Sequence, residues 1–520
     1  MTIALQSTTL LAGSLSSGAN VADFLLEGKN PARVALLGKD GSYTYGQLRS
    51  ASDAVAYFLL EQGGKKGDRV LLLAENSFFW IASYLGVMRA GLVAVPLPSG
   101  IEPEALLHIA ELTGPRFGFV QSKLVSSAAQ IPGMLIASDA TNCSSSGVAD
   151  FRRVLEHVPA NSGTHPSLEH TSSSDLAALM FTSGSTGKPR GVMISHGNIA
   201  ANTESIISAL QLTPQDRIMA VLPFHYCFGA SLLHTHFRVG GSVVMDSRFM
   251  YPDKVLERMI ESECTGFAGV PSHFQILLRK SSLPRMKFPQ LRYVQQAGGH
   301  LAPVFVRNLN AVLPDTDVFL MYGQTEATAR LTCLPASEVA ARPNSIGKPI
   351  PGVDIRVIKE NGDAVEPGEP GEIIASGKSI AAGYWRDDPS TAVTFRGGSL
   401  HTGDIATVDE DGFLYLLDRT RDFVKCGGER VSCQAIEEQL LEFSALLEAA
   451  VIGIPDEVLG EAVKAFVVPR DPQVAGFEDD LRQFCRLNLP LKWNPKTFAV
   501  LSALPKNNAG KVLKQALRQL

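Results

Sequence analysis

Short apolar runs alternate with longer amphipathic segments along the first two thirds of the chain. The runs are continuous, bounded by turn residues and too short for helices, so they predict buried strands. They lie at 69–74, 92–95, 117–120, 176–181, 218–222, 242–245, 291–296 and 317–321. Segments such as 48–59 and 78–89 carry apolar residues at helical spacing. Strands that alternate with helices predict an α/β fold with parallel, helix-covered sheets.

The pattern changes after residue 345, where glycine, proline and charged turns multiply between short apolar stretches. Such spacing predicts a small β-subdomain. Further on, a helix predicted at 434–442 and strands predicted at 449–454 and 462–469 indicate a separate, small α/β unit at the C-terminal end.

Length and composition agree with this division. A chain of 520 residues is too long for one hydrophobic core and implies two or more domains. Its 45% hydrophobic and 19% charged residues are typical of a folded globular protein. The formal net charge of -5 gives no electrostatic reason to expect a nucleic-acid partner.

Neither export nor membrane insertion is expected. No basic residue precedes Lys29, whereas a secretory signal needs a positive N-terminal region. The longest apolar stretch, 81–96, contains Arg89 and is too short to span a bilayer. The 7 cysteines include no Cys-x-x-Cys pair, so they indicate neither a zinc site nor a disulfide framework. We therefore expect a cytoplasmic protein with no membrane span.

The strand predicted at 176–181 ends in a loop of hydroxyls, glycines and cations. The loop reads Thr182-Ser183-Gly184-Ser185-Thr186-Gly187-Lys188, followed by Pro189-Arg190-Gly191. Glycine lets the backbone approach a ligand, successive N–H groups bind anions, and the two cations suit phosphate. The glycine spacing differs from that of the common P-loop. A flexible surface loop is the alternative, but the preceding buried strand favours a phosphate site.

Residues 181–191, Phe-Thr-Ser-Gly-Ser-Thr-Gly-Lys-Pro-Arg-Gly, resemble the signature loop of the AMP-forming adenylating enzymes. This superfamily comprises acyl- and aryl-CoA ligases, adenylation domains of peptide synthetases and beetle luciferases. The resemblance implies a large domain, 1–418, that binds ATP and the acyl group, and a small mobile α/β domain, 419–520. It also implies that residues 182–188 hold the β- and γ-phosphates.

A second polar cluster, Tyr322-Gly323-Gln324-Thr325-Glu326, follows the strand predicted at 317–321. Ligands of open α/β sheets gather at the carboxyl ends of strands, so this cluster is expected near the phosphate loop. It matches the family's Tyr-Gly-x-Thr-Glu. The match implies that Tyr322 packs near the adenine, that Thr325 contacts the α-phosphate, and that Glu326 holds Mg²⁺ with Thr182 nearby. A polar strand end with a helix-capping Thr-Glu is the alternative.

Three further segments match the nucleotide site of the family. The turn Ala297-Gly298-Gly299 resembles the small-residue turn beside the adenine, where missing side chains leave room for a flat ring. The resemblance implies that Asp404, within Thr402-Gly403-Asp404, and Arg419 contact the ribose hydroxyls. It also makes Arg421 the hinge between the two domains, although the family usually has aspartate or lysine there.

Two lysines of the C-terminal unit are implied to act in turn. Lys425 begins a segment that resembles the family's Lys-x-Gly-Gly-Glu loop, and Lys511 lies in a Gly-Lys pair that matches the family's catalytic loop. The resemblance implies that Lys511 serves adenylate formation. It further implies that the small domain then rotates and brings the Lys425 loop to the active site for thiol transfer.

The acyl pocket is expected around the aromatic, nearly uncharged segment 222–229. His225 is either a gate of this pocket or a core histidine bonded to a carbonyl, and the sequence leaves both open. Tyr226 and Cys227 follow it, and Val270 and His273 are further pocket candidates from the segment 269–273.

Together these motifs predict an AMP-forming acid–thiol ligase that activates a fatty or aryl acid with ATP and Mg²⁺. Coenzyme A is the favoured thiol, and the alternative is an acyl- or aminoacyl-carrier-protein ligase that uses protein-bound phosphopantetheine. Two other functional classes fit the sequence less well. A nucleotide-binding module without catalysis disagrees with Lys511 and Glu326, and a luciferase-like oxygenase needs a luciferin pocket that the sequence does not reveal.

Overall fold

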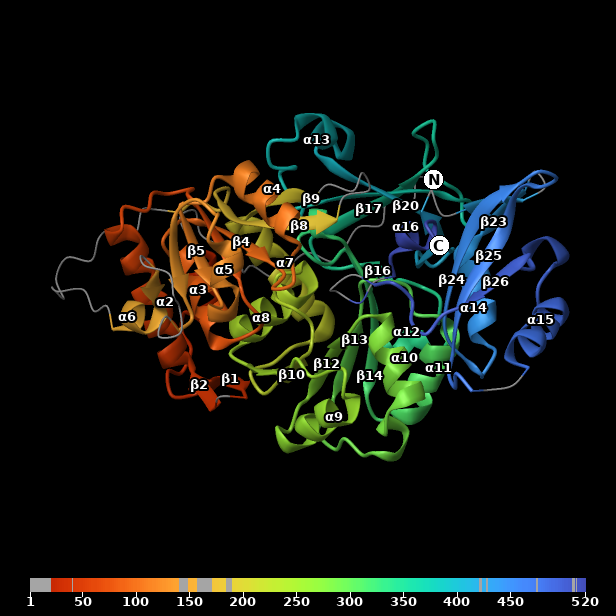
Figure 1. The fold of residues 1–520 in the computed structure, drawn as a ribbon, viewed down its shortest axis with the longest axis horizontal. Helices are drawn as coiled ribbons and strands as arrows, with labels where there is room; N and C mark the ends of the chain where they lie inside the picture. Colours follow the sequence, from red (N-terminus) through yellow and green to blue (C-terminus); the bar gives the residue numbers. More distant parts are fainter. Residues whose placement is uncertain are drawn as a thin grey trace.

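A computed structural model provides the structure of this chain (Figure 1). It describes residues 20–39, 41–139, 148–156, 171–183, 189–419, 423–426, 429–473, 476–506, 510 and 512–520, with the backbone alone at 183, 418, 419, 429 and 430. Across these residues, no helix is both long and apolar enough to cross a bilayer.

Among the described residues, the N-terminal sheet has seven strands in the order β7-β6-β5-β3-β4-β8-β9. They are β3 (Arg69–Leu73), β4 (Val93–Leu97), β5 (Phe117–Val120), β6 (Met134–Ala137), β7 (Ala149–Asp150), β8 (Leu176–Ser183) and β9 (Pro189–Ser195). β3 to β8 pair in parallel, as the continuous apolar runs predict, because parallel strands are buried on both faces. β8 and β9 instead form an antiparallel hairpin.

The central sheet has nine described strands in the order β16-β15-β14-β13-β12-β10-β11-β1-β2. They are β1 (Val34–Gly38), β2 (Gly41–Thr44), β10 (Arg217–Ala220), β11 (Ser242–Met245), β12 (Gly266–Gly269), β13 (Tyr293–Gln296), β14 (Asp317–Tyr322), β15 (Thr332–Leu334) and β16 (Lys348–Pro349). The hairpin of β1 and β2 joins this sheet through parallel pairing of β1 with β11. The alternating pattern therefore folds into two sheets.

Helices α7 (His196–Leu210) and α8 (Cys227–Val239) lie between the two sheets. α7 packs against β9, α8 packs against β10 and β11, and the two helices contact each other. The other large-domain helices are α1 (Val21–Leu26), α2 (Tyr45–Glu61), α3 (Phe78–Arg89), α4 (Pro103–Thr113), α5 (Val125–Ala128), α6 (Phe151–Leu155), α9 (Pro252–Glu261), α10 (Pro271–Lys280), α11 (Pro303–Val312), α12 (Ala336–Val339) and α13 (Asp388–Thr394). One hydrophobic core runs from the N-terminal sheet through α7 and α8 into the central sheet.

The predicted β-subdomain is a sheet of five described strands. They are β17 (Val353–Ile358), β18 (Gly371–Gly377), β19 (Phe395–Arg396), β20 (Ser399–Val408) and β21 (Leu414–Arg419). β20 is the central strand of this antiparallel sheet, pairing with β18, β19 and β21. It carries Asp404 from the subdomain toward the end of β14.

The C-terminal sheet, blue in Figure 1, also has five described strands. They are β22 (Phe423–Cys426), β23 (Glu429–Ser432), β24 (Leu446–Asp456), β25 (Gly460–Pro469) and β26 (Thr497–Val500), accompanied by α14 (Cys433–Leu441), α15 (Phe477–Asn488) and α16 (Lys514–Leu517). α14 packs on α11 of the large domain, and β24 packs on α10. These contacts dock the C-terminal unit beside the central sheet.

Candidate active site

The predicted phosphate loop connects the two strands of the β8–β9 hairpin. Thr182 pairs with Arg190 in the ladder, so the hairpin holds both ends of the loop close together. Gly184, Ser185, Thr186, Gly187 and Lys188 lie outside the described residues, as does the Ser183 side chain. Half-buried Arg190 lies 3.6 Å from an Asp387 carboxylate oxygen, and its guanidinium is 5.4 Å from the centre of the Tyr384 ring.

The predicted adenine turn and the Tyr-Gly-x-Thr-Glu cluster follow neighbouring parallel strands. Gln296, at the end of β13, pairs with Leu320 of β14, so both clusters begin at one edge of the central sheet. Gly298 has φ +83°, and a Cβ there would come within 3.0 Å of Val270. A side chain at this position would therefore be strained and would also fill the space beside the turn.

Tyr322 and Asp404 form a buried hydrogen bond across the junction of two sheets. The Tyr322 hydroxyl donates to the Asp404 carboxylate at 2.6 Å, although the two residues are separated by 82 positions in sequence. Asp404 lies opposite Arg419 in the pairing of β20 with β21. The Arg419 side chain is outside the described residues. The structure thus brings the predicted ribose carboxylate onto the predicted adenine tyrosine.

Glu326 is oriented by a residue that the sequence analysis missed. The Tyr384 hydroxyl donates to Glu326 Oε1 at 2.8 Å, and the Glu326 carbonyl accepts from the Ala381 amide at 2.9 Å. Burial and the nearby Glu326 charge raise the pKa of Tyr384, so its hydroxyl stays a donor. The Gly383-Tyr384-Trp385 segment, an aromatic pair in a polar stretch, was the available signal in the sequence.

Cys227, at the start of α8, connects the predicted acyl segment 222–229 with the Tyr322–Glu326 cluster. Its Sγ lies 3.4 Å from the Thr325 Oγ1. The preceding His225 is buried and its ring lies 4.3 Å from that of Tyr226. Desolvation lowers the pKa of His225 to about 3, and its Nε2 has no hydrogen-bond partner among the described residues. His225 is therefore a neutral ring at physiological pH.

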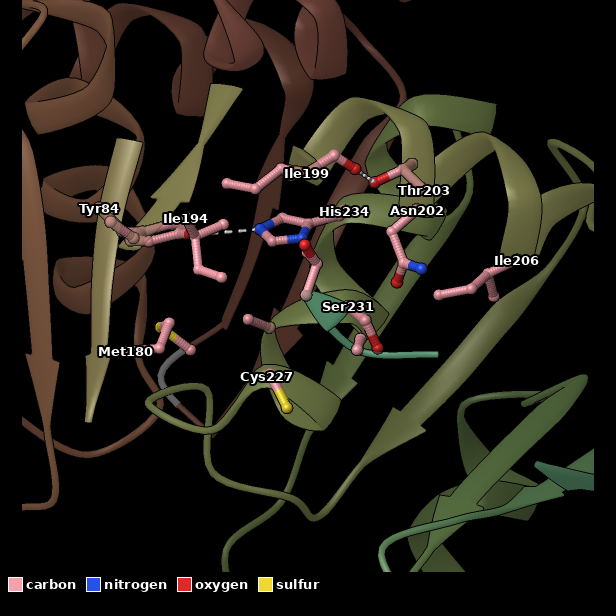
Figure 2. A pocket seen from close by; sticks show the side chains of 14 residues that line it. Tyr84, Met180, Ile194, Ile199, Asn202, Thr203, Ile206, Cys227, Ser231 and His234 are labelled. Atoms are coloured by element: carbon pink, nitrogen blue, oxygen red, sulfur yellow. Dashed lines mark hydrogen bonds between the residues drawn. The ribbon is translucent and has the colours of Figure 1, made fainter. Parts of the chain in front are cut away.

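A small enclosed space, here named the α8 cavity, lies beside Cys227 (Figure 2). It measures about 20 Å³, room for one water molecule. It is lined by Tyr84, Ala178, Met180, Ile194, Ile199, Asn202, Thr203, Ile206, Cys227, Ala230, Ser231, His234, Thr328 and Ala329. His234 Nε2 and the Tyr84 hydroxyl are 3.0 Å apart across its wall. Of the predicted pocket residues, Cys227 lines this cavity, whereas His225, Tyr226, Val270 and His273 do not.

Val270 and His273 instead mark the place where the C-terminal loop docks. His273 Nδ1 accepts from the Val270 amide at 3.2 Å and so caps the start of α10. The Ser272 hydroxyl donates to the Gly510 carbonyl at 3.1 Å. A Cβ on Gly510 would lie 3.1 Å from Val270 and 3.0 Å from Ser272 Oγ. Lys511 lies outside the described residues, but its neighbour Gly510 contacts the same valine as the adenine turn.

Lys425 occupies a different face of the C-terminal unit. It lies on β22, its side chain is exposed, and its backbone amide donates to Glu461 at 2.7 Å. Among the described residues, no hydrogen bond or ion pair joins Lys425 to Glu326, Asp404 or Thr325. Arg421, the predicted hinge, lies outside the described residues.

Comparison with known proteins extends over nearly the whole chain. Residues 27–385 match the AMP-binding enzyme family, and residues 435–511 match the AMP-binding enzyme C-terminal domain. A feruloyl-CoA synthase of Amycolatopsis sp is 31% identical over 94% of this chain and 96% of its own length. A long-chain-fatty-acid–CoA ligase of Salmonella typhimurium is 29% identical over 91% of this chain and 89% of its own length.

Solved structures agree with these relatives. The O-succinylbenzoate coenzyme A synthetase from Bacillus subtilis, in complex with ATP and magnesium ion, is 27% identical and superimposes with a TM-score of 0.83 over 97% of this chain and 100% of that one. The likeness confirms the predicted α/β class with a large N-terminal and a smaller C-terminal domain. The chain belongs to the AMP-binding enzyme family, the AMP-forming adenylating enzymes, and is an AMP-forming acid–thiol ligase of the acyl-CoA synthetase type.

Proposed function

We propose that this ligase activates an aliphatic or aryl carboxylic acid as its acyl-adenylate and then transfers the acyl group to the thiol of coenzyme A. A carboxylate resists attack because its leaving group would be oxide. Attack of the carboxylate on the α-phosphorus of ATP releases pyrophosphate and gives a mixed anhydride whose leaving group is AMP. The observation that carries this proposal concerns two carboxylates near the end of β14. Asp404 bonds to Tyr322, the last residue of β14, and Glu326, which bonds to Tyr384, follows shortly after that strand.

The family motifs suggest a role for each nucleotide-site residue, and the positions of Asp404 and Glu326 near β14 support these roles. We assign the ribose to Asp404 and Arg419, and the adenine to Tyr322, Gly323 and the turn of Ala297, Gly298 and Gly299. Thr325 is assigned to the α-phosphate, and the loop 182–188 to the β- and γ-phosphates. The space beside Gly298, which a Cβ would fill, supports the approach of a flat ring to the backbone.

Magnesium fits this site as an ion held largely by phosphate oxygens. The described residues contain no group of three or more His, Cys, Asp or Glu side chains that could hold a metal ion. Glu326 offers a carboxylate, and Thr182 a hydroxyl, which suits an ion that keeps water and phosphate ligands and binds one or two protein oxygens. When bound, Mg²⁺ neutralises charge on the phosphates.

We propose that the two faces of the C-terminal unit act in succession, with Lys511 serving adenylate formation and Lys425 serving thiol transfer. The docking of Gly510 on Ser272 supports Lys511 at the site in the present arrangement. The exposed Lys425 supports a second arrangement, reached by rotation at Arg421 between the domains 1–418 and 419–520. The thiols of Cys227, Cys264, Cys333, Cys426 and Cys485 are free, which supports a reducing compartment such as the cytoplasm.

ATP–pyrophosphate exchange across a panel of acids tests the first half-reaction. Segment 222–233 has no carboxylate to pair with an ammonium, and burying an unpaired charge costs several kcal/mol. Each buried methylene instead contributes about 0.8 kcal/mol. We expect exchange with aliphatic or aryl acids and almost none with α-amino acids. Greater exchange with a proteinogenic amino acid than with every other acid would overturn the assignment.

The acceptor is tested separately by mass spectrometry of the thioester product. Coenzyme A and a phosphopantetheine-bearing carrier protein present the same thiol arm, so both are supplied at equal concentration. We expect acyl-CoA as the main product, because the related enzymes are CoA ligases. Acylation of the carrier protein alone would replace coenzyme A by a protein partner.

A further inference from the structure

Arg330 is a fully buried cation with no carboxylate partner among the described residues, and its neighbours Cys227 and Ala329 line the α8 cavity. Its side chain is 2% exposed, and its Nε and Nη2 atoms have no hydrogen-bond partner among the described residues. The remaining nitrogen, Nη1, makes one long bond of 3.4 Å to the Ala329 carbonyl. Burial lowers the pKa of Arg330 to about 10, so the guanidinium remains charged at neutral pH.

The surroundings of this guanidinium contain rings and thiols in place of a carboxylate. Its carbon lies 3.8 Å from the centre of the Phe228 ring, and the ionisable groups that act on it are the thiols of Cys227 and Cys333. Burial raises the pKa of both thiols, so they are neutral and provide no anion. A buried charge without a counter-ion among the described residues is unfavourable in a folded protein, which points to a ligand as its partner.

Arg330 is held next to the acyl region by both its backbone and its ring contact. Asn202, which lines the α8 cavity, accepts from the Arg330 amide at 3.2 Å and donates to its carbonyl at 2.8 Å. Phe228 lies between the guanidinium and the adenine turn, since its ring edge is 3.9 Å from a Cβ built on Gly298. Cys227 lies 3.4 Å from the Thr325 hydroxyl, and the Arg330 charge acts on its thiol.

We propose that Arg330 binds a second carboxylate of the acid, so that the enzyme activates a dicarboxylic acid. A guanidinium with two nitrogens unpaired among the described residues presents the fork that a carboxylate accepts in bidentate fashion. Cys227, which bonds to Thr325 and interacts electrostatically with Arg330, links this guanidinium to the place where adenylation is proposed. This inference rests on the proposed function and specifies the far end of the substrate that the proposed function leaves open.

The test compares ATP–pyrophosphate exchange for malonate, succinate and glutarate with propionate, butyrate and pentanoate, and with the matching hydroxy acids. We expect the wild-type enzyme to prefer one diacid over the monoacid of equal length by about 100-fold. In Arg330→Gln this preference should disappear, because the diacid loses its partner while the monoacid keeps its rate. Arg330→Lys should retain part of the preference, because it keeps the charge without the fork.

A thermal unfolding measurement separates this role from a structural one. Removing an unpaired buried charge should leave the melting temperature of ligand-free Arg330→Gln equal to, or above, that of the wild type. ATP with the preferred diacid should raise the melting temperature of the wild type more than that of the variant. Arg279→Gln is the matched control: Arg279 bonds to three backbone carbonyls, so we expect a lower melting temperature and equal losses for all acids.

Three outcomes overturn the inference. Higher activity of the wild type with monoacids or hydroxy acids would do so and leave the proposed function standing. An equal loss for every acid in Arg330→Gln would assign Arg330 to the carboxylate or phosphates that all reactions share. Exchange with no acid on any panel would overturn the proposed function, and this inference with it.

Discussion

Tyr322 and Tyr384 fix the two carboxylates on which the proposed chemistry depends. Each phenol donates one short hydrogen bond, 2.6 Å to Asp404 and 2.8 Å to Glu326, which selects one orientation of a side chain that could otherwise rotate. The second carboxylate oxygen then points along a set direction. A positioned carboxylate costs little reorganisation when its ligand binds, which is the basis of electrostatic preorganisation.

We predict that Tyr384→Phe raises the Mg²⁺ concentration needed for half-maximal adenylate formation by about 10-fold to 100-fold. This is the range for loss of a hydrogen bond to a metal ligand. The measurement is a Mg²⁺ titration of pyrophosphate exchange. Tyr415→Phe is the matched control, because the hydroxyl of Tyr415, in β21, donates an equivalent 3.0 Å bond to the Asp409 carboxylate, apart from the site. An unchanged Mg²⁺ requirement in Tyr384→Phe would show that Glu326 needs no such support.

Lys511→Ala should remove adenylate formation yet spare thioester formation from a supplied acyl-adenylate. A donor aimed at developing charge contributes about 3 kcal/mol, which corresponds to a rate loss of about 100-fold or more. Single-turnover assays of the two half-reactions measure the effect, with Lys425→Ala expected to show the reverse profile. Equal loss of both half-reactions in a folded Lys511→Ala variant would contradict the use of two faces.

At this scale the sequence motifs predict candidate ligand-binding residues, whereas the residues that support them become visible only in the structure. Glu326 and Asp404 stand in recognisable motifs, and the structure brings each to the end of β14. Tyr384 and Arg330 were missed because their importance depends on a partner far along the chain, or on the lack of one. A cation between Ala329 and Leu331 was visible in the sequence, but burial without a counter-ion became visible only in three dimensions.

Among the secondary-structure elements, the sequence predicted most of the parallel strands but missed several strands, including β6, β12 and β15. β12 escaped notice because glycine stands at both of its ends, which weakens a strand signal. Gly266 is needed there: a Cβ would come within 2.3 Å of the Tyr293 ring on the neighbouring strand. The β8–β9 hairpin was also not foreseen, because the alternating pattern gives no information about which strand follows the phosphate loop in the sheet.

The contact of α10 and α11 with α14 determines how firmly the C-terminal unit is docked. Arg279 of α10 donates to the carbonyls of Leu441 and Leu446, where a cation also complements the C-terminal end of α14. Two contacts flank it: His300 Nε2 lies 2.8 Å from a Glu438 carboxylate oxygen, and Arg307 forms an ion pair with Glu442 at 2.6 Å. All three contacts belong to the arrangement in which Gly510 reaches Ser272.

Arg279→Met should therefore shift the enzyme away from this arrangement. Hydrogen bonds to a charged group contribute about 1.5–3 kcal/mol, so we expect adenylate formation to fall by about 10-fold or more. Thioester formation from a supplied adenylate should fall less, because it uses the other arrangement. Stopped-flow measurement of each half-reaction checks this, with Arg307→Met as a milder companion at the exposed rim. A larger loss in thioester formation would mean that these contacts serve the second arrangement.

For the molecule as a whole, five histidines with lowered pKa values set the response to acid. Burial lowers the pKa of His225 and His234 to about 3, and of His196, His236 and His273 to about 4. In the unfolded chain these rings take up protons near their ordinary pKa of about 6.5. Below that pH the unfolded state binds more protons than the folded state, so the free energy of unfolding decreases as the pH falls.

The expected effect is large compared with ordinary protein stability. Each histidine contributes up to about 1.4 kcal/mol per pH unit between its unfolded and folded pKa values, whereas whole domains are stable by about 5–15 kcal/mol. We predict that the midpoint of urea unfolding is near its maximum above pH 7 and decreases steeply between pH 6.5 and pH 5. His234→Gln should reduce this steepness by about one fifth. A midpoint that stays constant from pH 7.5 to pH 5 would mean that these rings become protonated within the folded protein, which would require water or an anion to reach them.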